Sequence, residues 1–224
     1  MFKSIQQKIA LNAYHLKMIA LITMLLDHIA RILFPEMVVL KIVGRMAFII
    51  YSFLIVEGFI YTKDTKKYLF RLLVFAIISE IPYDLAFGNL LFDPTRQNVF
   101  FSLSAGLIGL MVLQCKISSD LKVLLITVIV TIANMFHVDY YYLGIFQIIC
   151  FYAYRNSAIK KFLTVGILNV FFMFRIGVQA AAIMGFIPIY LYNGKQGKKT
   201  GKIFYWFYPL HILFLWMIKK LMRG

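Results

Sequence analysis

The sequence predicts an all-α polytopic membrane protein, a bundle of about nine transmembrane helices with a cytoplasmic N-terminus. Hydrophobic residues make up 62% of its 224 residues and charged residues only 15%, whereas a soluble domain is about 45–50% apolar and about 25% charged. Apolar stretches of about 17–25 residues recur between short polar gaps. Lysines and arginines are concentrated in alternate gaps, as they are in the cytoplasmic loops of membrane proteins.

The apolar stretches divide a single domain, residues 1–224, into successive helices without a linker or an internal repeat. We expect helices near Met18–Phe34, Met37–Ile60, Tyr68–Phe87, Asn98–Gln114, Leu121–Phe136, Tyr140–Tyr154, Phe162–Phe174, Gly177–Tyr192 and Phe204–Ile218. The first stretch contains charged residues and follows a polar, basic segment, so we expect it to remain as the first helix and not to be cleaved as a signal peptide. Cys115 and Cys150 have no paired spacing and are interpreted as small hydrophobic residues.

The distribution of basic residues gives the expected orientation. If the N-terminus is cytoplasmic, sixteen lysines and arginines lie on the inner side and eight on the outer side. The basic run Lys195–Lys202 belongs on the inner side by the same rule. It reaches that side only if residues 160–192 cross the membrane twice, and we expect two crossings there. The basic tail is an exception: the last helix either ends outside with three cations or does not fully cross. Because the net charge of +15 follows the loops in this way, it does not indicate a nucleic-acid-binding face.

Several ionisable residues interrupt the apolar helices. They are Asp27, His28, Arg45, Glu57, Glu80, Asp84 and His211. A charged side chain at the centre of a bilayer costs about 2.5–3.5 kcal/mol on insertion scales, so such residues usually face a cavity and pair with one another. The sequence therefore predicts a functional cavity. It contains no His-x-x-x-His or comparable ligand set, and we expect no metal site.

Lys17 and His28 are eleven residues apart in the first predicted helix. Eleven steps along a helix cover about 16 Å and close to three full turns, so both side chains would face the same side. Lys17 would then lie at the cytoplasmic edge, with His28 past the middle of the membrane. Alternatively, Lys17 is an interfacial lysine and His28 a helix-packing histidine. Asp27 projects about 100° away from His28, and we expect it to pair with a cation such as Arg31 or Arg45.

Two carboxylates flank a proline in the third apolar stretch. Glu80 and Asp84 are four residues apart and would share one face of an unbroken helix, but the proline between them is expected to kink it. Such a pair could bind a cation, share a proton, or form ion pairs with Arg71 and Arg45. We expect Arg45, Glu80 and Asp84 to line one polar cavity with His28.

Two further residues lie beside breaks in the pattern. His211 follows Pro209, a second proline within an apolar stretch, and either faces the cavity or bonds to a neighbouring helix. Asn98 precedes an apolar stretch and is expected to cap its helix.

The loop from Asn193 to Lys202 is rich in glycine and lysine. It is not a P-loop, because the spacing before its Gly-Lys pair is wrong and no strand precedes it. Lys195 and Lys198 could still attract the phosphates of a soluble cofactor, or the loop could serve as a topological anchor alone.

Several segments in a fixed order carry a resemblance to a known family. They are Leu16-Lys17, Asp27-His28-Ile29, Gly44 to Phe48, Glu57-Gly58-Phe59, Tyr68 and Arg71, Ile78 to Leu85, Gln97 to Phe100, Tyr192 to Lys195, and Phe207 to His211. Together they resemble the TraX family of membrane proteins, whose founding member is described as a pilin N-acetyltransferase. The resemblance covers most of the chain and is weakest over residues 116–179.

The resemblance implies an integral membrane acetyltransferase that takes its acetyl group from acetyl-CoA. The Lys17-to-His28 spacing is also similar to the basic-residue, ten-spacer, histidine pattern of the wider membrane acyltransferases, in which the histidine is regarded as essential. The acceptor would be a peptide or pilin-type N-terminus, a glycan hydroxyl or a small amine, and both direct transfer and an acetyl-histidine relay fit. The catalytic candidates are His28 as general base, Arg45, Glu80, Asp84 and His211. The candidates for donor binding are Lys17, Arg71, Lys195 and Lys198.

Two other classes of function fit the composition. A proton-coupled transporter would also bury carboxylates and histidines, although the chain shows no repeated halves. A non-catalytic membrane assembly protein would explain the hydrophobicity but not the clustered charges. In each case we expect the protein to lie in the cell membrane as a multi-pass protein with the lipid bilayer as its surroundings.

Overall fold

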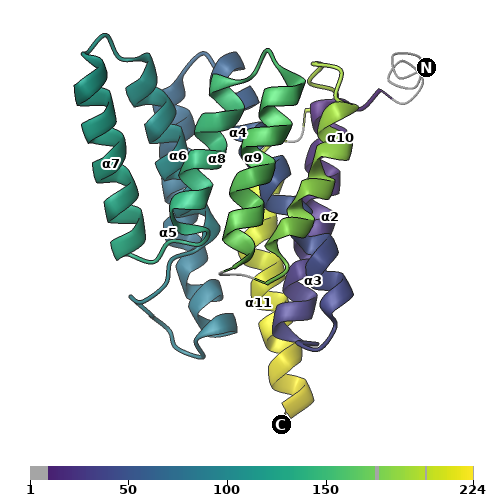
Figure 1. Ribbon diagram of the computed structural model, residues 1–224. Helices are drawn as coiled ribbons and strands as arrows, with labels where there is room; N and C mark the ends of the chain where they lie inside the picture. Colours follow the sequence, from purple (N-terminus) through teal and green to yellow (C-terminus); the bar gives the residue numbers. More distant parts are fainter. Residues whose placement is uncertain (1–9, 175–176, 200, 224) are drawn as a thin grey trace.

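A computed structural model describes residues 10–174, 177–199 and 201–223 of the chain, and within these residues the protein is all-α. Its helices run alternately between two ends of a bundle (Figure 1). They are α2 (Ala13–Ile32), α3 (Val38–Gly44), α4 (Met46–Tyr61), α5 (Thr65–Phe87), α6 (Val99–Gln114), α7 (Ser119–Met135), α8 (Tyr141–Ala153), α9 (Ala158–Met173), the 3₁₀ helix η1 (Gln179–Gly185), α10 (Phe186–Tyr190) and α11 (Ile203–Arg223). Counting α3–α4 and η1–α10 as one segment each, the described residues contain the nine helical segments that the sequence predicts.

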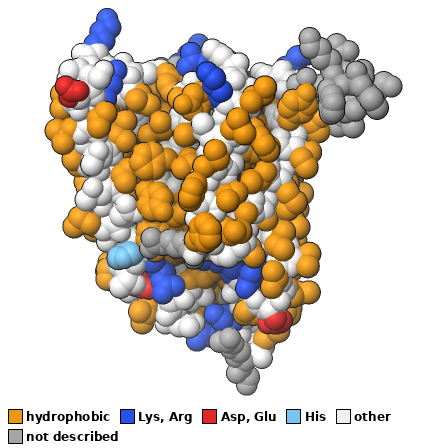
Figure 2. All heavy atoms as spheres, in the orientation of Figure 1, with side chains coloured by type: hydrophobic (Ala, Val, Ile, Leu, Met, Phe, Trp, Pro, Cys, Tyr) orange, Lys and Arg blue, Asp and Glu red, His pale blue; other side chains and the backbone are white. Residues whose placement is uncertain are grey.

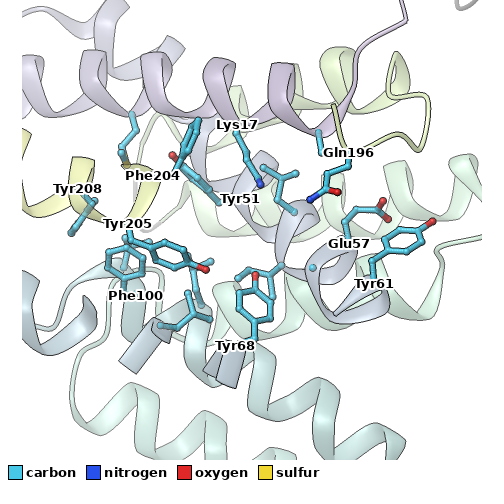
Figure 3. Close-up of a pocket in the computed structure, with 18 of the residues that line it drawn as sticks. Lys17, Tyr51, Glu57, Tyr61, Tyr68, Phe100, Gln196, Phe204, Tyr205 and Tyr208 are labelled. Atoms are coloured by element: carbon cyan, nitrogen blue, oxygen red, sulfur yellow. The ribbon is translucent and has the colours of Figure 1, made fainter. Parts of the chain in front are cut away.

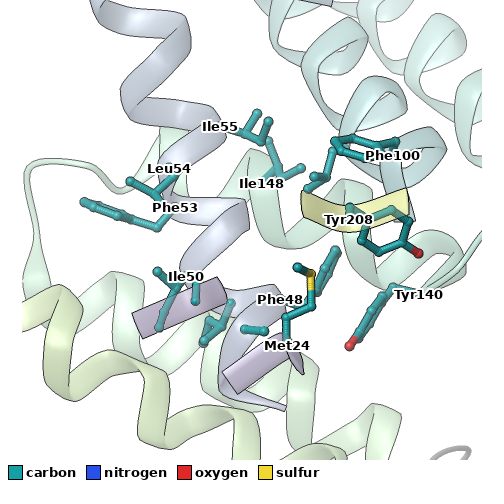
Figure 4. Packing of buried hydrophobic residues seen from close by; sticks show 14 of the residues in the cluster. Met24, Phe48, Ile50, Phe53, Leu54, Ile55, Phe100, Tyr140, Ile148 and Tyr208 are labelled. Atoms are coloured by element: carbon teal, nitrogen blue, oxygen red, sulfur yellow. The ribbon is translucent and has the colours of Figure 1, made fainter. Parts of the chain in front are cut away.

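Helix α4 lies at the centre of the bundle and packs against α2, α6, α8 and η1. Its buried side chains run along nearly its whole length and form the middle of the core, where Phe48, Phe53 and Leu54 meet residues of the surrounding helices (Figure 4). Helix α11 packs against α5 and α2, so the last helix closes the bundle beside the first. Helix α7 packs against α6 and α8 at one edge (Figure 1).

Side-chain caps explain where many helices begin. The side chains of Asn12, Asp64, Asn98, Ser118 and Ser157 each accept a hydrogen bond from a backbone N–H in the first turn of the helix that follows. The expected cap at Asn98 is confirmed. The bond that Asp64 accepts from the Lys67 backbone favours the ionised carboxylate and lowers its pKa.

Two predicted helices differ in detail from the observed ones. The stretch predicted as Met37–Ile60 is broken at Arg45 into α3 and α4. The stretch predicted as Gly177–Tyr192 begins as the tighter 3₁₀ helix η1 and becomes α-helical at Phe186. At this junction Gly185 packs closely on α4, because a Cβ there would lie 3.2 Å from the carbonyl oxygen of Met46 and collide with Ile49.

Two helical segments of the described chain are long and apolar enough to cross a membrane by length and composition, namely Ala13–Ile32 and Val38–Tyr61. Four others, α6 to α9, have 13 to 17 residues each. A 16-residue helix is about 24 Å long, less than the hydrocarbon core of about 30 Å. Helix α5 has 23 residues but contains charged residues near both ends. The fold is therefore all-α as predicted, whereas nine transmembrane helices are not established by this criterion.

The basic loop and the basic tail lie at opposite ends of the bundle. Backbone bonds from Leu11 to Leu191 and from Ala13 to Lys195 place the start of α2 and the basic loop at the same end. At the other end, the Lys219 ammonium donates to the carbonyl of Ala86. Helix α11 thus extends through the bundle with its basic tail at the far end (Figure 1). Lys3, Lys8 and Arg175, which entered the charge count, lie outside the described residues.

Candidate functional site

Two histidines far apart in sequence meet inside the bundle. His28 on α2 and His211 on α11 are separated by 183 positions, yet His28 Nδ1 lies 2.6 Å from His211 Nε2. The exposed fractions of the two residues are 5% and 7%. Edge-on contacts with Phe87 and Tyr208, at centroid distances of 5.9 and 5.7 Å, hold the His28 ring. The structure therefore brings together two of the five catalytic candidates.

A buried ion pair lies beside His28. The Asp27 carboxylate is hydrogen-bonded to the Arg45 guanidinium and lies 3.6 Å from Arg31. The expectation that Asp27 pairs with one of these arginines is confirmed. Gly44 makes the approach of α3 possible, because a Cβ at that position would lie 2.7 Å from the Asp27 Cα atom. The break after Gly44 then leaves Arg45 directly opposite Asp27.

Asp139 and Tyr140, which are not among the predicted site residues, complete this charged cluster. Arg31 lies over the Phe87 ring at 4.5 Å from its centroid and interacts electrostatically with Asp139. Arg45 lies 6.0 Å from the centroid of the Tyr140 ring. Asp139 and Tyr140 belong to the short α7–α8 connection, where Tyr140 has a φ of 63°. The signal available in the sequence was a carboxylate, Asp139, in the short connection between two apolar stretches.

Glu80 and Asp84 hold the connection between α5 and α6. Glu80 accepts hydrogen bonds from the backbone N–H of Asn98 at 3.0 Å and from its side-chain amide. Asp84 accepts the backbone N–H of Asp93 at 2.8 Å. Of the three alternatives for these carboxylates, the ion pairs with Arg71 and Arg45 are not observed among the described residues. Helix α5 continues unbroken through its proline, and its carboxylates meet backbone donors of the following loop instead of cations.

One oxygen of each carboxylate, Oε2 of Glu80 and Oδ1 of Asp84, is buried with no hydrogen-bond partner among the described residues. Within the same part of the chain, no group of three His, Cys, Asp or Glu side chains is arranged to hold a metal ion. Glu80 and Asp84 thus support the loop that starts α6, and their catalytic roles remain predictions.

A cavity of about 390 Å³ opens at the end of the bundle where α2 begins. Figure 3 shows Lys17 pointing into it, with aromatic side chains from several helices around it. The loop residues Gly194, Gln196 and Gly201 contribute to its lining. The other lining residues are Ala13, Met24, Tyr51, Leu54, Ile55, Glu57, Gly58, Tyr61, Tyr68, Leu72, Val99, Phe100, Leu103, Tyr192, Phe204, Tyr205 and Tyr208. Arg45, Glu80, Asp84 and His28 are not among them, so the expected single cavity shared by these four is not observed.

The cavity nevertheless extends toward the histidine pair. Met24, one helical turn before His28 on α2, lines it, and so does Tyr208, whose ring contacts both His28 and His211. Because Lys17 also lines it, the cavity follows α2 from the lysine to within one turn of His28. This agrees with the expectation that the two residues face the same side of their helix.

The remaining donor-binding candidates lie near the same end. The Arg71 guanidinium lies 5.7 Å from the centroid of the Tyr68 ring, which lines the cavity. Lys195 and Lys198 are exposed on the loop whose neighbouring residues contribute to the lining. All four candidates are thus grouped at one end, with Lys17 inside the cavity and the other three around it.

The family model described as TraX protein matches residues 12–219. The chain belongs to the TraX family. The chain is similar to the "Probable fimbrial assembly protein FimC, serogroup H1" of Dichelobacter nodosus, with 30% identity over an alignment of 247 positions that covers 97% of this chain and 99% of that protein. No solved structure matches the chain.

Membership of the TraX family confirms the resemblance inferred from the sequence segments. The matched residues include both histidines, the Asp27–Arg45 pair and the full set of residues that line the cavity. The site described above is therefore located within the part of the chain that the family model matches.

Proposed function

We propose that this protein is an integral membrane acetyltransferase, which moves an acetyl group from acetyl-CoA to an amine or hydroxyl acceptor. The observation that carries the proposal is the cavity that leads from Lys17 to within one turn of the His28–His211 pair. It provides a binding space for a donor at one end and a potential base at the other. Its volume falls within the range of about 300–1,000 Å³ that is usual for small-ligand sites.

The molecular surface supports a membrane location. Figure 2 shows hydrophobic side chains covering the visible face between two ends where lysines and arginines gather. The outward side chains of α7 and α9 are largely apolar, among them Val123, Leu124, Ile159 and Phe171. Monomeric soluble proteins rarely expose contiguous apolar patches beyond a few hundred Å². Because α6 to α9 are shorter than the usual hydrocarbon core, such a surface favours a bundle that spans a thin or locally thinned bilayer.

The donor would enter from the end that carries the basic loop. Lys195, Lys198 and Arg71 supply positive charge near the mouth for the phosphates of acetyl-CoA, and Lys17 supplies it inside the cavity. The aromatic and aliphatic lining suits the flexible arm that ends in the thioester. In this arrangement the acetyl group would reach the inner end of the cavity, beside Met24 and Tyr208.

The reaction requires a base for the acceptor and a proton for the leaving thiolate. The acceptor nitrogen or oxygen forms a bond to the thioester carbonyl carbon while His28 takes its proton. The carbon–sulfur bond then breaks, and the thiolate leaves with that proton. The products are the acetylated acceptor and CoA. Arg31 and Arg45, which pair with Asp27 beside His28, would stabilise the negative charge that develops on the thioester oxygen.

The name of the Dichelobacter nodosus relative favours a peptide acceptor of the fimbrial type, and it also favours a second candidate function. A non-catalytic membrane assembly protein would share that name and the apolar surface. The two candidates differ in the donor: an assembly protein has no need of an acetyl-CoA site, whereas the acetyltransferase requires one.

Binding of acetyl-CoA to the full-length protein in lipid nanodiscs separates these candidates. We expect saturable binding, and we expect Lys17→Met to weaken it about tenfold, equivalent to about 1.4 kcal/mol for the loss of one phosphate-binding charge. Lys63→Met is the matched control, because Lys63 is an exposed lysine at the same end outside the cavity. Absence of binding by the wild-type protein would contradict the acetyltransferase proposal and favour the assembly function.

The orientation can be tested by cysteine labelling in intact cells. In a background with Cys115→Ala and Cys150→Ala, we expect Phe92→Cys, in the exposed α5–α6 connection, to react with an impermeant maleimide from outside. Lys198→Cys should react only after the cells are permeabilised. Labelling of Lys198→Cys from outside would reverse the orientation and with it the side from which the donor enters.

A further inference from the structure

The two buried histidines form a directed hydrogen-bond chain with a backbone carbonyl. His211 Nδ1 lies 2.6 Å from the carbonyl oxygen of Phe207, and His211 Nε2 lies 2.6 Å from His28 Nδ1. The planes of the two imidazoles differ by 19°, and their centroids are 4.9 Å apart. A nitrogen–nitrogen distance of 2.6 Å is too short for rings stacked face to face, because non-bonded atoms separate by about 3.5–4.0 Å. The rings are therefore joined edge to edge through their nitrogens.

The carbonyl oxygen determines where the protons lie. A carbonyl oxygen accepts hydrogen bonds and cannot donate, so His211 Nδ1 carries a hydrogen and donates it to Phe207. In a neutral His211 ring, Nε2 is then the unprotonated nitrogen and accepts. His28 Nδ1 must be the donor to it, which leaves His28 Nε2 as the unprotonated nitrogen of that ring.

The opposite direction would require an unfavourable arrangement. If His211 donated from Nε2 while remaining neutral, its bare Nδ1 would face the Phe207 oxygen, with two lone pairs directed at each other. If His211 carried hydrogens on both nitrogens, a buried cation would lie in the same part of the bundle as Arg31 and Arg45. Both alternatives are disfavoured by the contacts around the pair.

His211 is itself held in place. Its ring packs against the Phe207 ring at a centroid distance of 4.7 Å with 18° between the planes, in addition to the bond with the Phe207 carbonyl. Tyr208 contacts both histidine rings with edge-on geometry. A fixed acceptor on α11 therefore faces His28 on α2.

We propose that His211 is a positioning residue that holds His28 in the tautomer with hydrogen on Nδ1, so that His28 Nε2 is the atom that takes the proton of the acceptor. This assignment rests on the proposed acetyltransferase function for its consequence, although the tautomer itself does not. When Nε2 gains the proton, the cationic His28 continues to donate from Nδ1 to His211 Nε2, which stabilises the developing charge. The proton on Nε2 then passes to the departing thiolate and restores the starting tautomer.

The tautomer can be measured directly by nitrogen NMR on protein with ¹⁵N-labelled histidine in nanodiscs. His15→Gln and His137→Asn leave His28 and His211 as the two labelled rings, since the chain has four histidines. Glutamine preserves the capping box at position 15, and asparagine suits the φ of 49° at position 137. We expect both remaining rings to show a protonated Nδ1 and a bare Nε2. A His28 ring protonated on Nε2 would overturn the assignment.

Variants at position 211 distinguish positioning from a purely structural role. His211→Leu removes the acceptor while keeping bulk, and we expect it to lower kcat by about 10²-fold with KM for acetyl-CoA little changed. His211→Gln supplies an amide oxygen that can accept a hydrogen bond from His28 Nδ1. We expect its kcat to be about tenfold higher than that of His211→Leu. In the NMR spectrum, His28 should lose its Nδ1-protonated form in His211→Leu and retain it in His211→Gln.

Equal activity losses in the two variants, with an unchanged His28 tautomer, would show that His211 is structural. If no variant and no wild-type preparation transfers acetyl groups, the proposed function fails, while the spectra still decide the tautomer. The tautomer and the proposed function are therefore tested independently of each other.

Discussion

Replacing His28 with alanine should lower acetyl transfer by about 10²–10⁴-fold, the usual contribution of a positioned general base. The imidazole lies one turn beyond the inner end of the cavity. In the alanine variant His211 Nε2 loses its donor, but the Phe207 carbonyl and ring still hold the His211 imidazole at its place on α11, so it does not take the position of the missing base. Transfer of the acetyl group to the acceptor, followed by mass spectrometry, is the measurement.

The alanine variant must also be shown to fold. Removing His28 leaves His211 Nε2 without its donor in a buried place, which costs about 1–3 kcal/mol. Thermal unfolding and gel filtration in detergent should therefore show a folded, slightly less stable protein. His137→Asn, at an exposed position of the α7–α8 connection, is the control and should keep wild-type activity. If His28→Ala retains most of its activity, His28 is structural and His211 becomes the leading candidate for the base.

Local sequence patterns predicted most of the helices, because the caps and faces of a helix depend on residues that are close together along the chain. The cap at Asn98 needs only the first turn of α6, and the common face of Lys17 and His28 follows from helical geometry alone. The break at Arg45 could not be predicted in this way. It results from the close approach of α3 to α2 at Gly44, a tertiary contact that depends on where Asp27 lies in the folded bundle.

Pairing across the site was predicted less well than the helices. A histidine on the first helix and a histidine on the last were both selected, but their contact across 183 residues depends on how α11 packs against α2. For Glu80 and Asp84, ion pairs with arginines were one of three alternatives, considered because unpaired carboxylates are costly in a membrane. That reasoning omitted backbone N–H groups, each of which donates to one oxygen of Glu80 or Asp84 at the α5–α6 connection.

The role of Arg45 has to be tested together with the carboxylate to which it is bonded. The bonded carboxylate is Asp27, and both residues are buried, with side-chain exposed fractions of 7% and 8%. Arg31 lies 3.6 Å from the same carboxylate but is more exposed, at 30%. Removal of either member of the inner pair leaves a charge in a place with little access to water. When Arg45 is the member removed, Arg31 can compensate only from the more exposed side of the carboxylate.

Arg45→Gln should therefore destabilise the protein by about 3–5 kcal/mol, the usual cost of stranding one member of a buried ion pair. Adding Asp27→Asn neutralises the stranded carboxylate and should recover much of that loss, so the double-mutant cycle on unfolding free energy should show strong coupling. The exposed pair Asp64–Lys67 is the matched control, and Asp64→Asn with Lys67→Gln should couple by less than about 1 kcal/mol. Additive losses at Asp27 and Arg45 would contradict the buried pair. Recovery of stability in the double variant without recovery of acetyl transfer would show that Arg45 also acts on the reaction, beyond holding α3 against α2.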